Sequence, residues 1–343
     1  MKRLKRPHAR GLWNVRDTLV AVSDTVLELA DVRAASEVIR GRVHRTPMFG
    51  SATLGERIGA EVWLKAELFQ KTGSFKPRGV LNKLSKLSDE EKRRGVISIS
   101  AGNHAQALAY ASSREGIDAL VVMWETASPL KIEAARGYGA TIDTEAPDIP
   151  AAFERLDELT ESTGRTLVHP YDDPAVMAGQ GTVGLELLED VSEPDVVLVP
   201  VGGGGLVAGI ATAVKAQSPA TRVVAVEPER SRALHESLKA GEPVTVEAAS
   251  IADGLNGPYA GASCVRQCLA LGVESVLVTE EELQDAFRFL YTRAKLAPEL
   301  AGAATTAALM AGKAGVEPGQ TVVADVSGGN VVAQTAAAIL AGR

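Results

Sequence analysis

Cysteine is scarce in this sequence, basic side chains are not in excess, and long apolar runs are missing. With two cysteines in 343 residues, Cys264 and Cys268, the chain cannot build a disulfide framework or a four-ligand zinc site. We expect both to be free thiols, which is typical of a reducing compartment and indicates a cytoplasmic protein. The net charge of −7 argues against a nucleic-acid partner, because nucleic-acid-binding proteins present a basic face. No apolar run approaches the roughly 18 residues of a membrane span, so we expect no membrane partner.

Short apolar stretches alternate with helix-like stretches along the chain. Residues 96–100 (VISIS), 195–201 (DVVLVPV) and 321–325 (TVVAD) are nearly continuous apolar runs, as strands covered on both faces must be. The sequence therefore predicts an α/β fold with parallel, doubly wound sheets. The basic start of the chain departs from this pattern, and we predict that residues 1–26 form a flexible N-terminal extension.

Three loops with anion-binding or polar character follow predicted strands. Gly202–Gly205 lies between a strand and a helix, where backbone N–H groups and the helix dipole suit a phosphate. Ser100–Gln106 (SAGNHAQ) offers successive N–H groups and polar side chains, which suit a carboxylate. Ser327–Asn330 (SGGN) is the third loop. Because open α/β sheets bind ligands at the carboxyl ends of their strands, we expect these loops to meet at one site.

The glycine run also fits a different cofactor. Gly203, Gly205 and Ala208 match G-x-G-x-x-A, and Glu227 ends the next predicted strand, as in dinucleotide-binding folds. A nicotinamide-dependent oxidoreductase is therefore an alternative. The competing interpretation of Glu227 is a surface carboxylate at a strand end.

Lys76 stands between Phe75 and Pro77 in the stretch KTGSFKPRG. A lysine in an apolar setting is desolvated, so its pKa falls and its amine becomes a nucleophile and base near neutral pH. A phosphate site, a carboxylate site, a lone hydroxyl and an inward lysine together match the needs of pyridoxal phosphate, which forms a Schiff base with lysine.

From about Asp31 onward the chain resembles the serine/threonine dehydratase and serine racemase family, the fold type II pyridoxal-phosphate enzymes. The motifs TGSFKPRG, SAGNHAQA, VGGGGLVAG and SGGN occur in the family's order and spacing. The resemblance implies a tryptophan synthase beta-like fold with the active site between two domains. It predicts a large cofactor-binding domain from residues 27–90 and 174–343, a small substrate-binding domain from residues 91–173, and no C-terminal regulatory domain.

The resemblance also implies the roles of the motif residues. Lys76 would carry the cofactor and act as the catalytic residue. The substrate carboxylate would be bound by Ser100, Ala101, Gly102, Asn103 and His104. The cofactor would be bound by Phe75 beside the ring, Asn103 at the 3-hydroxyl, Gly202, Gly203, Gly204, Gly205 and Leu206 at the phosphate, Ser327 at the pyridine nitrogen, and Glu299. We expect no metal, because Ala233 replaces one of the carboxylates that metal-binding relatives use, and we assign no role to His169.

The activity implied is β-elimination from L-threonine or L-serine, giving 2-oxobutanoate or pyruvate and ammonia, by a homodimer or homotetramer. Racemases of the family have a serine where this chain has Ala101, which favours an ammonia-lyase over a racemase. A racemase or a β-replacement enzyme, a hydroxyaspartate dehydratase, the nicotinamide oxidoreductase, and a catalytically silent amino-acid-binding regulator remain alternatives.

Overall fold

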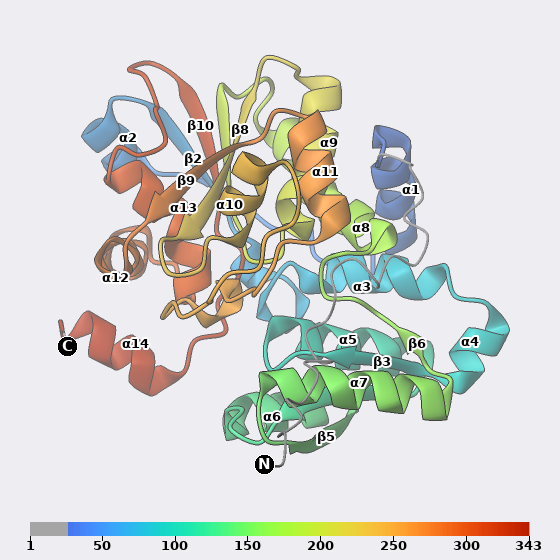
Figure 1. Cartoon of the computed structure of the whole chain (residues 1–343). Helices are drawn as coiled ribbons and strands as arrows, with labels where there is room; N and C mark the ends of the chain where they lie inside the picture. The colour runs from blue at the N-terminus through green and yellow to red at the C-terminus, as the bar shows by residue number, and fades with distance from the viewer. Residues whose placement is uncertain (1–26, 343) are drawn as a thin grey trace, which may run out of the picture.

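The computed structural model describes residues 27–342 and contains two separate β-sheets (Figure 1). The predicted extension over residues 1–26 lies outside the described residues. The larger sheet has six strands in the order β1-β2-β10-β7-β8-β9, all parallel except for the antiparallel pair of β1 and β2. Its strands are β1 (Met48–Gly50), β2 (Glu61–Lys65), β10 (Thr321–Asp325), β7 (Val196–Pro200), β8 (Arg222–Pro228) and β9 (Glu274–Val278).

The smaller sheet has four parallel strands in the order β5-β4-β3-β6. They are β5 (Thr141–Ala146), β4 (Ala119–Trp124), β3 (Val96–Ile99) and β6 (Thr166–Leu167). The predicted α/β class with parallel sheets is therefore confirmed. All four strands fall inside residues 91–173, the range predicted for the small domain, whose boundaries remain a prediction.

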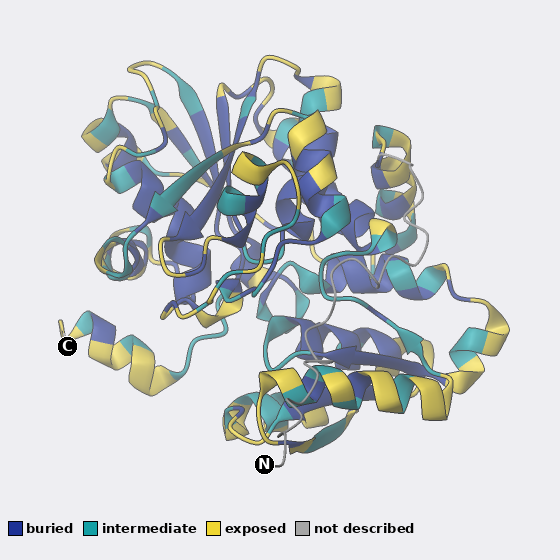
Figure 2. Ribbon diagram, viewed as in Figure 1, coloured by how far each residue is buried: buried dark blue, intermediate teal, exposed yellow. Residues whose placement is uncertain are grey.

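Helices cover both faces of each sheet, which explains the continuous apolar strands. In β7, Val196 and Leu198 pack into one core while Val197 and Val199 pack into the core on the opposite face, because successive side chains of a strand alternate. Figure 2 shows buried strands beneath helices whose outer faces are exposed. One face of the larger sheet is covered by α2 (Ala52–Ile58), α12 (Glu280–Phe289), α13 (Leu300–Met310) and α14 (Ala333–Leu340), and the other by α1 (Leu29–Ile39), α8 (Pro174–Asp190), α9 (Gly205–Gln217), α10 (Ala233–Ala240) and α11 (Ala262–Ala270).

The smaller sheet is covered in the same way. One face carries α3 (Lys76–Ser85), α5 (Asn103–Glu115) and α6 (Pro129–Gly137), and the other carries α7 (Ile149–Thr163). A further helix, α4 (Asp89–Arg94), precedes β3 and begins with the capping box of Ser88 and Glu91.

Cys264 and Cys268 are free and buried on α11. Within the described residues, no helix is long and apolar enough to cross a bilayer.

A buried cluster of charged side chains fixes the first turn of α3. The Arg78 guanidinium is fully buried and donates to Glu67, from Nε to Oε2 at 2.8 Å and from Nη2 to Oε1 at 2.7 Å. Its Nη1 donates to Glu186 Oε1 on α8 at 2.6 Å, and Lys65 Nζ donates to Glu186 Oε2 at 2.6 Å. Paired charges with satisfied hydrogen bonds are the form in which ions persist in a protein interior. This cluster joins α3 to β2, to α8 and to the short 3₁₀ helix η1 (Glu67–Phe69).

Candidate active site

The three predicted loops meet at one cavity of about 510 Å³. Ser100 follows β3, Gly202 follows β7 and Ser327 follows β10, so strands of both sheets direct their carboxyl ends at it. All of the predicted site residues line this cavity: Phe75, Lys76, Ser100, Ala101, Gly102, Asn103, His104, Gly202, Gly203, Gly204, Gly205, Leu206, Glu299 and Ser327. The fold therefore brings together residues that lie far apart in the sequence.

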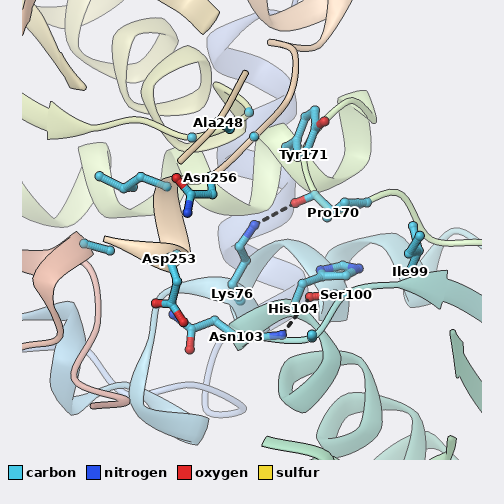
Figure 3. A pocket seen from close by; sticks show the side chains of 18 of the residues that line it. Lys76, Ile99, Ser100, Asn103, His104, Pro170, Tyr171, Ala248, Asp253 and Asn256 are labelled. Carbon is cyan, nitrogen blue, oxygen red and sulfur yellow. Dashed lines mark hydrogen bonds between the residues drawn. The ribbon is translucent and has the colours of Figure 1, made fainter. Parts of the chain in front are cut away.

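Lys76 is the first residue of α3, and its side chain extends into the cavity (Figure 3). Its Nζ donates a hydrogen bond to the backbone oxygen of Pro170 at 2.8 Å and lies 5.2 Å from the centre of the Phe75 ring. Burial lowers the pKa of Lys76 to about 8, because removal from water penalises the charged amine. The amine is thus partly unprotonated near neutral pH, which allows it to act as a nucleophile and as a base.

The glycine loop joins β7 to α9 and has little room for side chains. Gly204 has a φ of +96°, which favours glycine, and it caps α9. A Cβ atom on Gly203 would lie 2.2 Å from the ring of Tyr171, and one on Gly205 would lie 2.8 Å from the Tyr171 backbone oxygen. The loop therefore presents bare backbone N–H groups at the positive end of a helix, which is the arrangement that binds phosphate groups.

Replacing Gly203 with alanine is expected to weaken cofactor binding by about tenfold or more, because the ring and the loop must separate. Gly137→Ala is the matched control, since a Cβ there meets nothing within 4 Å. Equilibrium titration of each apoprotein with pyridoxal phosphate measures the effect. Equal affinities for the two variants would contradict this account of the loop.

The turn between β3 and α5 forms a second anion site from backbone groups. The first N–H groups of α5, at Asn103 and His104, have no acceptor within the helix. The Ser100 hydroxyl accepts a hydrogen bond from the Gly102 N–H at 3.2 Å, which tightens the turn. A carboxylate at this helix end would meet both free N–H groups and the helix dipole.

The His104 imidazole is anchored on the interior side of this turn. Its Nε2 lies 3.1 Å from both Ser98 Oγ and the Val168 backbone oxygen. Burial, together with the nearby charge of Lys76, lowers the pKa of His104 to about 3, so the ring is neutral at neutral pH. The imidazole therefore fixes the turn. Because the ring is neutral, it contributes no positive charge to the binding of an anion.

Asn103 links the second loop to the third. Its Nδ2 donates to Glu299 Oε1 at 2.6 Å, and its Oδ1 accepts from Asn330 Nδ2 at 2.8 Å. The same Asn330 nitrogen donates to the Thr72 backbone oxygen at 2.7 Å. Burial raises the pKa of Glu299 to about 7. These bonds fix the orientation of the Asn103 amide at the cavity, which the buried Ser327 also lines.

The segment before α8 contributes residues to the cavity that no sequence motif predicts. Pro170 accepts the Lys76 hydrogen bond, Tyr171 covers the glycine loop, and His169 lines the same cavity. His169 Nδ1 accepts from the backbone N–H groups of Tyr171 at 3.2 Å and Asp172 at 2.8 Å. No short motif marks this segment, because its role depends on its packing against distant loops.

The interpretation of Glu227 as a surface carboxylate is wrong. Its side chain is fully buried and accepts hydrogen bonds from the backbone N–H groups of Leu234 at 2.8 Å and His235 at 2.7 Å. Burial raises the pKa of Glu227 to about 8. The carboxyl group caps the first turn of α10, so it is already engaged where a nicotinamide enzyme would bind a ribose hydroxyl.

Comparisons with known proteins agree with this geometry. A family model described as "Pyridoxal-phosphate dependent enzyme" matches residues 39–328. The chain is 43% identical over 319 residues to "L-threonine dehydratase catabolic TdcB" of Staphylococcus aureus (strain N315), covering 92% of each protein. A solved threonine deaminase, from T.th., is 42% identical with a TM-score of 0.84, over 89% of this chain and 99% of that one. Maize serine racemase is 34% identical with a TM-score of 0.87, over 91% and 96% of the two chains.

The expected family and the expected cofactor class are therefore confirmed. The family match covers most of the chain and includes the loop of Lys76, the turn of Asn103 and the glycine run. The two-sheet architecture and the cavity between the loops agree with it. This chain belongs to the family of pyridoxal-phosphate dependent enzymes.

Proposed function

We propose that the chain is an ammonia-lyase that eliminates water from L-threonine, L-serine or both, releasing a 2-oxo acid and ammonia. The observation that carries this proposal is the buried Lys76 amine, which faces a cavity with a phosphate-binding loop and a carboxylate-binding turn. The relatives named as threonine dehydratase and threonine deaminase support the reaction type.

The described residues fit pyridoxal phosphate. Gly202–Gly205, with the Leu206 backbone, would hold the phosphate, because any larger residue at 203 or 205 would collide with Tyr171. Asn103 would donate to the ring hydroxyl with its second Nδ2 hydrogen, since the first is given to Glu299. Ser327 would face the ring nitrogen. When bound, the cofactor supplies a conjugated system that accepts the electrons released at the substrate α carbon.

The chain's own groups would then perform the proton transfers and hold the substrate. The N–H groups at the start of α5 bind the α-carboxylate and fix the α carbon near Lys76. Lys76 Nζ takes the α proton, because its lowered pKa leaves part of the amine unprotonated. Loss of the β-hydroxyl as water gives an enamine, which water hydrolyses to the 2-oxo acid and ammonia after release.

Ala101 favours elimination over racemisation. Racemisation needs an acid on the face of the α carbon opposite to Lys76, and the methyl group of Ala101 carries no exchangeable proton. A related solved structure is a serine racemase, so the same fold accommodates both outcomes. The residue at 101 is therefore the position at which we expect the two reactions to diverge.

The purified enzyme is expected to form 2-oxobutanoate from L-threonine or pyruvate from L-serine, with little D-serine. Ala101→Ser is expected to raise D-serine formation by about tenfold relative to pyruvate, since it adds a hydroxyl on the far face. Chiral chromatography and a 2-oxo acid assay on the same samples measure this ratio. Racemisation comparable to elimination in the unmodified enzyme would contradict the proposal.

The binding partner that we propose for the cavity is a small-molecule amino-acid substrate. A homodimer or homotetramer remains a prediction, which light scattering coupled to size-exclusion chromatography would test. The nicotinamide alternative loses its main support because Glu227 caps α10.

A further inference from the structure

An ion pair joins the two sides of the cavity at its solvent-exposed edge. Lys131 lies on α6, which covers the smaller sheet, and Asp253 lies in the 3₁₀ helix η3 (Asp253–Leu255), which follows α10 in the larger part of the chain. Lys131 Nζ donates to Asp253 Oδ2, and both residues line the cavity. The Asp253 side chain is 61% exposed and the Lys131 side chain 21% exposed. Figure 3 shows Asp253 between Asn256 and Asn103 at the cavity.

Few cationic side chains line the cavity, so the Lys131–Asp253 pair matters for the positive charge available to a substrate side chain. Among the described lining residues, the lysines are Lys76 and Lys131, and no arginine is present. Lys76 serves the reaction, and the α-carboxylate is received by backbone N–H groups. His104 and His169, which also line the cavity, are neutral at neutral pH because burial lowers their pKa values to about 3 and about 4. Lys131 is therefore the remaining cation, and Asp253 already neutralises it.

The position of the pair keeps it within electrostatic reach of the cavity. The pKa of Glu299 is raised to about 7, mainly by burial; the charge of Asp253 contributes to this rise and the charge of Lys131 opposes it. A second carboxylate on a substrate would thus approach the charged Asp253 without a free cation to receive it. Like charges at short range disfavour binding, and desolvation of the added carboxylate has no compensation.

We propose that the Lys131–Asp253 pair sets the charge specificity of the cavity, so that it accepts 3-hydroxy amino acids with neutral side chains and discriminates against 3-hydroxyaspartate. This inference rests on the proposed function, because it names the substrate class of the same reaction. Asp253 determines the specificity in two ways. Its ion pair with Lys131 neutralises the ammonium group, and its own negative charge repels a second carboxylate on the substrate.

The test is the variant Asp253→Asn, which keeps the side-chain shape and frees Lys131. Its ratio of kcat/KM for L-3-hydroxyaspartate to kcat/KM for L-threonine is expected to rise about tenfold over the unmodified enzyme. Asp118→Asn is the matched control, because Asp118 pairs with Arg165 outside the cavity and is 62% exposed. The control should leave the ratio unchanged. An unchanged ratio in Asp253→Asn, with both rates altered equally, would overturn the proposal.

A binding measurement separates this inference from the reaction itself. Calorimetric titration of the cofactor-loaded protein with L-aspartate and L-asparagine compares two ligands of similar size that differ in side-chain charge. Asp253→Asn should improve aspartate binding relative to asparagine about tenfold, and the double variant Lys131→Met/Asp253→Asn should lose that gain. Retention of the gain without Lys131 would overturn the proposal. If the unmodified enzyme does not eliminate water from threonine, the proposed function fails, whereas the titration still decides the role of the ion pair.

Discussion

Replacing Lys76 with alanine is expected to lower kcat/KM for elimination by about 10³-fold or more, because general base catalysis alone contributes on that order. The variant also loses the amine that attaches the cofactor, so the visible absorbance of the lysine-bound cofactor should disappear. The fold should persist, since the buried contacts of α3 are made by later residues such as Val80, Leu81 and Leu84. Absorbance spectra, a 2-oxo acid assay and circular dichroism measure these effects.

The matched control is Lys86→Ala, which removes an exposed lysine from the end of the same helix. It should leave the spectrum and the rate unchanged. A pH series adds a second check, because burial lowers the pKa of Lys76 to about 8. Attachment of pyridoxal phosphate to the apoprotein should therefore accelerate from pH 7 to pH 9, as the amine loses its proton. Normal turnover by Lys76→Ala would show that another group performs both tasks.

Replacing Arg78 with methionine is expected to lower the free energy of unfolding by about 3–5 kcal/mol, because it leaves buried carboxylates without their partner. Glu67 and Glu186 both depend on this guanidinium, and Arg78 and Glu67 are fully buried. Burial by itself raises the pKa of Glu186, but Arg78 and Lys65 hold it below its usual value. A carboxyl with a lowered folded-state pKa stabilises the fold at neutral pH, and that contribution is lost as pH falls.

The difference in stability between the unmodified protein and Arg78→Met should therefore narrow as pH falls. Urea unfolding at several pH values, followed by fluorescence or circular dichroism, measures it. Arg93→Met is the control, since its ion pair with Glu90 has side chains 68% and 58% exposed, and such surface pairs contribute about 0–1 kcal/mol. Equal losses in the two variants would mean that the buried cluster contributes no more than a surface pair.

The parts of the site that the sequence predicts are those encoded in short contiguous motifs. The turn of Ser100–His104, the glycine run and the loop of Ser327 each follow a strand, and parallel sheets bring such loops to one edge. The short motifs therefore predict both that these segments are loops and that the loops lie at the carboxyl ends of the strands. Lys76 was recognisable because its neighbours are apolar, and burial of its amine agrees with that interpretation.

The parts that the sequence does not predict are contacts between distant residues. Arg78 and Glu186 are 108 positions apart, and Lys131 and Asp253 are 122 positions apart. No periodicity or local motif encodes such pairs, because they depend on how the helices pack. Glu227 illustrates the same limit, since a carboxylate at a strand end suggests exposure until α10 is seen to fold over it. The sequence does not predict the role of Tyr171, because the side chain packs against the bare backbone of Gly203.

The pairing of β2 with β10 has a consequence for the biosynthesis of the enzyme. Strand β2 is made early, yet its parallel partner aligns Thr321 with Glu61, near the far end of the chain. On a ribosome that adds about 5–20 residues per second, β10 is synthesised tens of seconds after β2, and β2 lacks this pairing partner until then. During this interval the segment with Lys76 already exists, but the edge that supports Ser327 does not. The nascent chain can therefore complete its cofactor site only after β10 has been made and has paired with β2.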